Sequence, residues 1–251
     1  MSTKTLRTEA LSKNWGAFAA NSDVSLTFQP GARHALIGPN GAGKTTFINL
    51  LTGAFAPTGG KVWLGDTDIT NLAQHQRVKL GMTRTFQINT LFAGMTVLAS
   101  VVLAISERRG LQSVWYKTVA SHTDLVDEAM ALLATLKLTS EANSITRSMA
   151  YGKQRLVEIA LALATKPTIL LLDEPAAGIP SAESQELFEA IAQLPREVTV
   201  VFIEHDMGLV FRFADRITVM VGGKVLTEGT PAEIAADPRV REVYLGEAEH
   251  A

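Results

Sequence analysis

The segment GPNGAGKT, residues 38–45, carries the residue types that bind a polyphosphate. It fits the pattern G-x-x-x-x-G-K-[ST] in full. Glycines let the backbone curl so that its N–H groups and the start of a following helix face phosphate oxygens. Lys44 adds positive charge, and the hydroxyl of Thr45 is a suitable Mg²⁺ ligand. An ordinary glycine turn is the alternative. The predicted phosphate-binding residues are Asn40, Gly41, Ala42, Gly43, Lys44, Thr45 and Thr46.

Two apolar runs further along the chain also end in reactive side chains. Residues 169–174 end in Asp173 and Glu174, and residues 198–205 end in His205. Asp173 would hold Mg²⁺, and Glu174 could orient the attacking water or accept its proton. An imidazole at the end of the second run could reach a terminal phosphate. The acidic pair could instead cap the next element, and a lone histidine is usually structural. The phosphate loop upstream favours nucleotide hydrolysis.

A third candidate is SMAYGKQRLVEIALALA, residues 148–164. Its apolar residues recur with helical spacing, which predicts a helix that buries one face. Gly152 stands just ahead of the predicted helix. A helix start offers N–H donors and a positive dipole end to an anion. The plain alternative is a loop followed by a core helix.

The intervening sequence predicts alternating strands and helices. Continuous apolar runs too short for helices predict strands buried on both faces of a parallel sheet. Gly53 is placed to end the helix after the phosphate loop, and Gly222 and Gly223 mark a hairpin turn. The charged ERR, residues 107–109, is interpreted as a solvated helix end. The further expected elements are a strand and turn at 61–69, helices within 96–138 and at 181–194, a hairpin at 216–229 and a short helix pair at 230–246.

Composition narrows the classes of protein. The chain has 251 residues, of which 47% are hydrophobic and 19% charged, as in ordinary globular proteins. A net charge of −2 gives no general electrostatic reason to expect a nucleic-acid partner. The absence of cysteine excludes disulfides and thiolate metal sites and fits a reducing compartment. No apolar run approaches the roughly 18 residues of a membrane span, and no signal peptide is recognised. We therefore expect a chain that does not cross a bilayer.

Taken in order, the motifs resemble the ATP-binding cassette (ABC) ATPases, the nucleotide-hydrolysing subunits of ABC transporters. The resemblance covers essentially the whole chain and rests on GPNGAGKT, RTFQ, AYGKQ, LLLDE and IEHD. It implies an α/β P-loop NTPase of the ABC ATPase type, with a mixed sheet core, an N-terminal antiparallel β region and an inserted helical subdomain. The implied single nucleotide-binding domain spans 1–251, with the core and β region at approximately 1–90 and 165–251 and the helical subdomain at approximately 91–164.

The same resemblance assigns ATP and Mg²⁺ as cofactors and gives roles to further residues. Gln87 would contact Mg²⁺ and sense the membrane partner, and Trp15 would stack on adenine. The signature residues would bind the γ-phosphate of ATP held by the opposite subunit. The implied signature residues are Ala150, Tyr151, Gly152 and Lys153, and the implied Mg²⁺ ligands are Thr45, Gln87 and Asp173.

Further stretches, among them AYGKQRLVEIA, LDEPAAGIP and the ending YLGEAEHA, look like the ATPase subunits of branched-chain amino acid importers. Two residues depart from the family pattern. Ala150 lies where the usual signature has serine, and Pro180 lies where an aspartate is expected. Both departures favour pairing with a distinct second cassette, although a homodimer stays possible.

The resemblance also implies partners and a location. The partners would be a second ABC ATPase subunit, two transmembrane permease subunits and, indirectly, a periplasmic or extracellular solute-binding protein, with no nucleic acid. The location would be the cytoplasmic face of a bacterial inner membrane, as a peripheral subunit. The transported solute would be a branched-chain amino acid or a related small solute.

Three alternatives remain. One is the ATPase of an ABC exporter, and another is a soluble ABC ATPase that acts on nucleic acid or ribosomes. DNA-repair types carry a long coiled coil, for which the segment between Gln87 and Tyr151 is too short, and ribosomal types carry two cassettes per chain. A catalytically dead scaffold is disfavoured because the expected catalytic residues are all present, namely Lys44, Asp173, Glu174 and His205.

Overall fold

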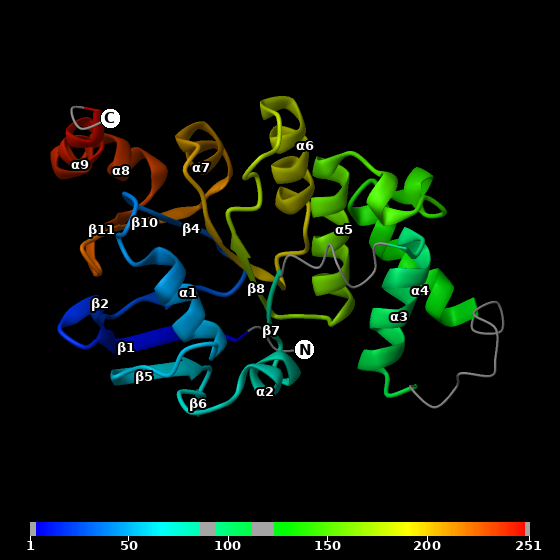
Figure 1. Cartoon of the computed structure of the whole chain (residues 1–251), viewed down its shortest axis with the longest axis horizontal. Helices are drawn as coiled ribbons and strands as arrows, with labels where there is room; N and C mark the ends of the chain where they lie inside the picture. The colour runs from blue at the N-terminus through cyan, green and yellow to red at the C-terminus, as the bar shows by residue number, and fades with distance from the viewer. Residues whose placement is uncertain (1–3, 86–93, 112–122, 249–251) are drawn as a thin grey trace. The chain divides into compact units, whose positions relative to one another are not determined.

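The computed structural model describes residues 4–85, 94–111 and 123–248 (Figure 1). The chain divides into two compact units, which we call the sheet unit and the helical unit. The sheet unit comprises Met1–Met82, Thr168–Pro175 and Pro195–Ala251. The helical unit comprises Thr83–Pro167 and Ala176–Leu194. Each unit is described by itself.

The sheet unit is built on a six-stranded sheet with the order β11-β10-β4-β9-β8-β7. Strands β10, β4, β9 and β8 are parallel, and β11 forms an antiparallel hairpin with β10. Every residue of β4 and β9 is buried, as the continuous apolar runs predict. The strands are β4 (Arg33–Ile37), β7 (Met82–Arg84), β8 (Ile169–Asp173), β9 (Thr199–Ile203), β10 (Arg216–Val221) and β11 (Lys224–Gly229).

A second, antiparallel sheet of five strands lies near the N-terminus. Strand β1 pairs with β2, β3 and β5, and β6 extends the sheet from β5. Apolar side chains from both sheets and from the first helix share one buried core, which includes Leu6, Phe28, Phe47 and Leu171. The strands are β1 (Leu6–Trp15), β2 (Phe18–Val24), β3 (Thr27–Phe28), β5 (Gly59–Leu64) and β6 (Thr67–Asp68). The predicted N-terminal antiparallel region is confirmed.

Helix α1 (Lys44–Thr52) follows β4 through the glycine-rich loop. It ends at Gly53, whose φ of 76° gives the left-handed cap predicted from the sequence. Arg77, on α2 (Gln74–Lys79), is 1% exposed and donates hydrogen bonds to the carbonyls of Leu50 and Leu51 at 2.8 and 2.6 Å. These bonds satisfy carbonyls that a helix C-terminus otherwise leaves unpaired. The C-terminal end of the helix that follows the phosphate loop is therefore fixed.

Three helices complete the described part of the sheet unit. They are α7 (Met207–Phe213), α8 (Pro231–Ala236) and α9 (Pro238–Ala248). Thr230 and Glu233 form a capping box at the start of α8, which agrees with the predicted terminal helix pair. Across the described residues, every helix is too short or too polar to span a bilayer.

The helical unit contains α3 (Val97–Arg108), α4 (Thr123–Thr135), α5 (Tyr151–Ala164) and α6 (Ser181–Ala192). Helix α5 differs from the expected amphipathic helix. All residues from Leu156 to Ala164 are buried, so this part of the helix is enclosed on every side rather than on one face. Ala160, Ala162 and Ala164 allow close packing of α5 against its neighbours α3, α4 and α6.

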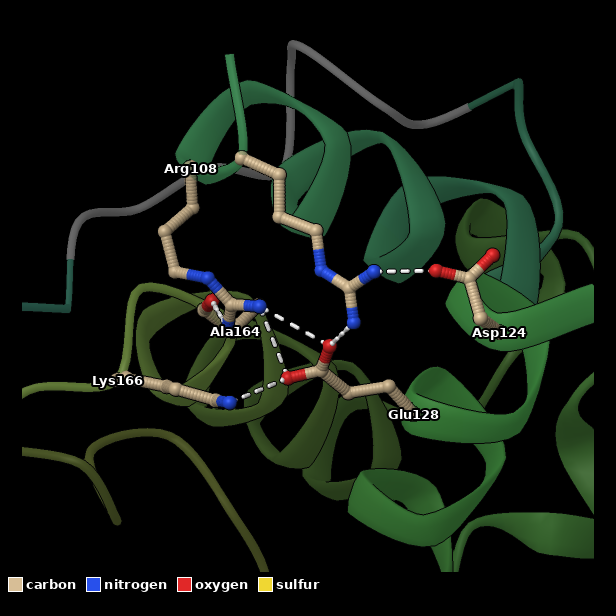
Figure 2. A network of polar contacts seen from close by, with 6 residues as sticks. Arg108, Asp124, Glu128, Ala164 and Lys166 are labelled. Carbon is tan, nitrogen blue, oxygen red and sulfur yellow. Dashed lines mark hydrogen bonds and ion pairs between the residues drawn. The ribbon is translucent and has the colours of Figure 1, made fainter. Parts of the chain in front are cut away.

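A network of charges joins the ends of three helices in this unit (Figure 2). Its members are Glu128, the three cations Arg108, Arg109 and Lys166, the carboxylate of Asp124 and the carbonyl of Ala164. Burial by itself would raise the pKa of Glu128, but hydrogen bonds from the three cations lower it to about 2. The interpretation of ERR as a solvated helix end agrees with the structure, because Arg108 ends α3 and both Glu107 and Arg109 are exposed. The two arginines additionally bind acids on α4.

Candidate active site

At two positions of the loop between β4 and α1, only glycine fits the backbone and its surroundings. A Cβ on Gly38 would lie 2.1 Å from the carbonyl oxygen of Met220, and one on Gly43 would lie 2.4 Å from that of Ala20. Gly41 has a φ of 78° and open space around it. The first N–H groups of α1 have no partner within the helix, so they are donors for an anion. The backbone fits a polyphosphate.

Lys44 places its charge inside this loop. The residue is only 6% exposed, and its ammonium group donates hydrogen bonds to the carbonyls of Gly38 and Pro39. These contacts hold the side chain folded back over the loop instead of extended into solvent. A cation and a set of backbone donors thus converge on one segment, which is the arrangement that binds phosphate oxygens.

Glu174 and His205 form the second part of the site. Glu174 directly follows β8, and its Oε1 lies 3.0 Å from Nε2 of His205, which follows β9 after one residue. Glu174 has a φ of 49°, and its N–H donates to the carbonyl of Ile203 at 3.1 Å. A non-glycine residue in this conformation costs about 1–3 kcal/mol and such residues cluster at functional sites. The neighbouring strands β8 and β9 therefore present the pair together.

A cavity of about 240 Å³ connects these groups. Its described lining consists of Phe18, Ala20, Asn40, Gly41, Ala42, Gly43, Lys44, Thr45, Thr46, Glu174 and His205. The volume is below the roughly 300–1,000 Å³ of pockets that enclose a whole small molecule. It suits a polyphosphate with the rest of a nucleotide outside. Sequence reasoning missed Phe18 and Ala20, although an aromatic on each side of the Gly16 turn was a visible signal.

Trp15 is not among the described residues that line the cavity. Its ring makes an edge contact with Phe55, at 5.3 Å between centroids, and the ammonium of Lys13 lies 4.3 Å from its centroid. Trp15 pairs with Phe18 across the β1–β2 hairpin, and paired residues present their side chains on the same face. Their exposed fractions are 49% and 64%. An exposed aromatic pair therefore adjoins the cavity.

The signature residues lie in the helical unit. Helix α5 begins at Tyr151, with Ala150 as its N-cap. The prediction that Gly152 precedes the helix is therefore wrong, because this glycine is inside the first turn. Its N–H donates to Oε2 of Glu183 on α6 at 3.1 Å. The ammonium of Lys153 lies 3.3 Å from a carboxylate oxygen of Glu141.

Known sequences include relatives that match this chain over nearly its whole length. The sequence profile described as "ABC transporter" matches residues 21–177, which is more than half of the chain. The high-affinity branched-chain amino acid transport ATP-binding protein LivG of Escherichia coli (strain K12) is 41% identical over 99% of this chain and all of that protein. The corresponding protein BraF of Pseudomonas aeruginosa is 40% identical, with 99% and 100% covered.

This chain belongs to the ABC transporter family of ATP-binding proteins. A second profile, "Branched-chain amino acid ATP-binding cassette transporter", matches residues 224–250. Among solved structures, the ADP conformation of the ABC cassette MJ1267 superposes with a TM-score of 0.85 and 33% identity, covering 98% of this chain and 100% of that one. A nucleotide-free ABC cassette gives a TM-score of 0.82 at 32% identity, with 96% and 98% covered. The protein is an ATP-binding ATPase of the ABC fold.

Two further residues, Asp173 and Pro180, lie at the boundaries of elements. Asp173 ends β8, in register with Ile203 of β9, one residue before Glu174. Pro180 occupies the N-cap position of α6, where its side chain makes no capping hydrogen bond. Gln87 lies outside the described residues, so its predicted contact with Mg²⁺ stays a prediction.

Proposed function

We propose that this ABC ATPase is the ATP-hydrolysing subunit of an importer for branched-chain amino acids or a related small solute. The cavity that joins the phosphate loop to Glu174 and His205 carries the catalytic part of the proposal. The solute class is supported by the names of relatives that match the chain from end to end. An exporter ATPase has no comparable support.

In the proposed site, Lys44 and the N–H groups at the start of α1 bind the phosphates of ATP. Residues 40–46 shape the loop, and the exposed rings of Trp15 and Phe18 are placed to stack on the base. Because the cavity accommodates only a polyphosphate, the base and ribose would lie against these rings.

We assign the Mg²⁺ ligands to Thr45, Asp173 and Gln87. The first is a hydroxyl one residue into α1, and the second is a carboxylate at the end of β8. Both are oxygen donors of the kind that Mg²⁺ prefers alongside phosphate oxygens. When bound, the ion would neutralise charge on the β- and γ-phosphates.

Glu174 is assigned to the attacking water. Its carboxylate is the general base or the group that orients the water, and His205, 3.0 Å away, fixes that carboxylate and can face the γ-phosphate. The backbone bond from the Glu174 N–H to Ile203 holds the carboxylate at the end of the strand. Phosphoryl transfer depends mainly on the correct positioning of the nucleophile and the phosphate, which a carboxylate fixed in this way supplies for the water.

We infer that the ATPase works as half of a pair, on the cytoplasmic face of a bacterial inner membrane. The signature residues Ala150–Lys153 would face ATP held by the opposite cassette. The missing serine at 150 and Pro180 in the loop after Glu174 favour a distinct second cassette over a second copy of this chain. Two permease subunits and a solute-binding protein would complete the importer.

The test is isolation of the assembly from the native host. The chain is tagged, membranes are solubilised gently, and co-purifying proteins are identified by mass spectrometry. Two permease-like proteins and a second ABC cassette are expected. Recovery of ribosomes or nucleic acid would contradict the transport function, and recovery of this chain as the sole cassette would contradict the heterodimer.

Transport itself is measured as uptake of labelled leucine, isoleucine and valine by cells. We expect uptake to be lost with Lys44→Ala while the permease proteins remain present. Uptake at the wild-type rate in this variant would contradict an importer powered by this subunit. Loss of export of another solute, with uptake unchanged, would support the exporter.

A further inference from the structure

The signature segment lacks the serine hydroxyl of its family, so another donor must face the phosphate if the proposed pairing of cassettes holds. Ala150 offers no side-chain hydrogen bond. The ammonium of Lys153 is bound to Glu141, and the Gly152 N–H is bound to Glu183. Tyr151 is the signature residue with a hydroxyl group, and its side chain is 37% exposed.

Arg155 holds the Tyr151 side chain in two ways. Its Nη2 donates a hydrogen bond of 2.6 Å to the tyrosine hydroxyl, and its Cζ lies 4.9 Å from the centroid of the ring. The two residues are four apart on α5, where side chains of a helix meet. A hydroxyl that accepts from arginine keeps its own O–H, which can donate to an anion. The ring face and the hydroxyl are both fixed by one guanidinium group.

Glu158 in turn holds Arg155. Nη1 of Arg155 donates to Oε2 of Glu158 at 2.8 Å, and the two side chains are only 11% and 6% exposed. Within the described part of the chain, Nε of Arg155 and Oε1 of Glu158 have no hydrogen-bond partner. Burial raises the pKa of Glu158, although the bond and the charge of Arg155 oppose the shift.

An ion pair is unusual in a helix that is as deeply buried as α5. The rest of the helix from Leu156 to Ala164 is apolar apart from Glu158, and a buried pair with unsatisfied atoms is often no better for stability than an apolar pair of similar volume. Its outer end is the hydroxyl of Tyr151, a residue that is itself exposed. The ion pair is therefore better explained as a support for the Tyr151 side chain than as a contribution to the stability of the fold.

We propose that Tyr151 supplies the hydroxyl donor that Ala150 lacks, for the γ-phosphate of ATP bound by the opposing cassette, and that Arg155 and Glu158 are its positioning residues. The relay runs from Glu158 through Arg155 to the Tyr151 hydroxyl. The inference rests on the proposed function, because the signature segment needs an opposing cassette to act on.

The test is a double-mutant cycle on the ATPase of the complex purified through this chain. Tyr151→Phe keeps the ring and removes the hydroxyl, and Arg155→Met keeps an unbranched stem and removes the guanidinium. We expect each variant to lower kcat/KM for ATP at least tenfold, as for a lost hydrogen bond to a charged group. The double variant should lose no more than the single ones, because both changes break the same relay.

Thermal unfolding of the same proteins separates positioning from stability. Tyr151→Phe should unfold at the wild-type temperature despite its loss of kcat/KM. Glu158→Gln, which keeps an acceptor for Arg155, should retain more activity than Arg155→Met. Tyr244→Phe removes a hydroxyl from a half-buried tyrosine on α9 and is the control, with kcat/KM expected to stay at the wild-type value.

Two outcomes would overturn the relay. One is wild-type kcat/KM in Tyr151→Phe, and the other is additive losses in the cycle, with activity falling only as far as the unfolding temperature falls. Failure of the complex to form at all is a different result, since it would contradict the proposed function and not the relay. Measuring the composition of each purified complex before the kinetics distinguishes the two.

Discussion

Among single residues, Glu174 depends on the backbone that presents it. The left-handed φ of Glu174 and its N–H bond to Ile203 orient the carboxylate toward His205. Because these are backbone features, replacement of the side chain leaves them in place. We expect Glu174→Gln to lower kcat by about 10²–10⁴-fold, because an amide cannot accept the proton of the attacking water. ATP affinity should persist, and the closed, ATP-bound pair should accumulate. Single-turnover hydrolysis and nucleotide binding are the measurements.

The matched comparison is Lys44→Ala, which removes charge from the phosphate loop without touching Glu174. This variant should lose nucleotide binding, whereas Glu174→Gln should bind and fail to hydrolyse. Hydrolysis near the wild-type rate in Glu174→Gln would remove this residue from the chemical step. Unchanged ATP affinity in Lys44→Ala would contradict the assignment of the phosphate loop.

The aromatic residues at the hairpin make a second prediction at this scale. Phe18 lines the cavity and Trp15 lies across the hairpin from it, so in the proposed site both rings would stack on adenine. Each change to alanine should weaken ATP binding about tenfold, since stacking on a base contributes about 1–3 kcal/mol. Binding of inorganic tripolyphosphate should not change. Equal losses for ATP and tripolyphosphate would instead indicate a disturbed loop, and no loss for Trp15→Ala would restrict stacking to Phe18.

At the scale of elements, the charge network of Figure 2 fastens the ends of α3 and α4 to the end of α5. Glu128→Gln should lower the free energy of unfolding by about 1 kcal/mol at pH 7, a modest value because the ion pairs are partly exposed. The folded pKa of about 2 lies below the ordinary value of 4.5, so this contribution is present above pH 4.5 and is lost as the pH falls toward 2. Urea unfolding at pH 7 and pH 3 measures it.

The control for this network is Glu107→Gln, which makes the same change of charge at an exposed position on α3. It should leave the unfolding free energy within about 0.5 kcal/mol of the wild type. A loss at Glu128 that is the same at pH 3 as at pH 7 would contradict an ionic origin. A loss of equal size at Glu107 would indicate a general effect of net charge.

Elements set by local patterns were predictable, and contacts between distant segments were not. The apolar runs of β8 and β9, the cap at Gly53 and the positions of Glu174 and His205 after their strands follow from neighbouring residues. The contact between Glu174 and His205 depends on the strand order, which places β8 beside β9. The start of α5 was placed one turn too late in the chain, because glycine is unfavourable within a helix and its N–H bond to Glu183 is invisible in the sequence. Burial of α5 on all sides likewise depends on neighbours that only the fold supplies.

At the scale of the whole molecule, one buried histidine links stability to pH. His34, in β4 of the central sheet, is 1% exposed, and its Nε2 lies 2.7 Å from Oγ1 of Thr218 in β10. Burial, aided by the charge of Arg216, lowers its pKa from 6.5 to about 4. Between these values the unfolded chain binds a proton that the folded protein does not, so stability falls as the pH drops from 6.5 toward 4.

The size of this effect makes it measurable. A shift from 6.5 to about 4 corresponds to about 3 kcal/mol at the acidic limit, a large fraction of the roughly 5–15 kcal/mol that stabilises a domain. His34→Gln should reduce the slope of unfolding free energy against pH between pH 7 and pH 5, because glutamine does not titrate. His75→Gln, on the exposed surface of α2, should leave that slope unchanged. If both variants keep the wild-type slope, the acid sensitivity of the fold belongs to its carboxylates, and the buried imidazole is protonated without cost through its contact with Thr218.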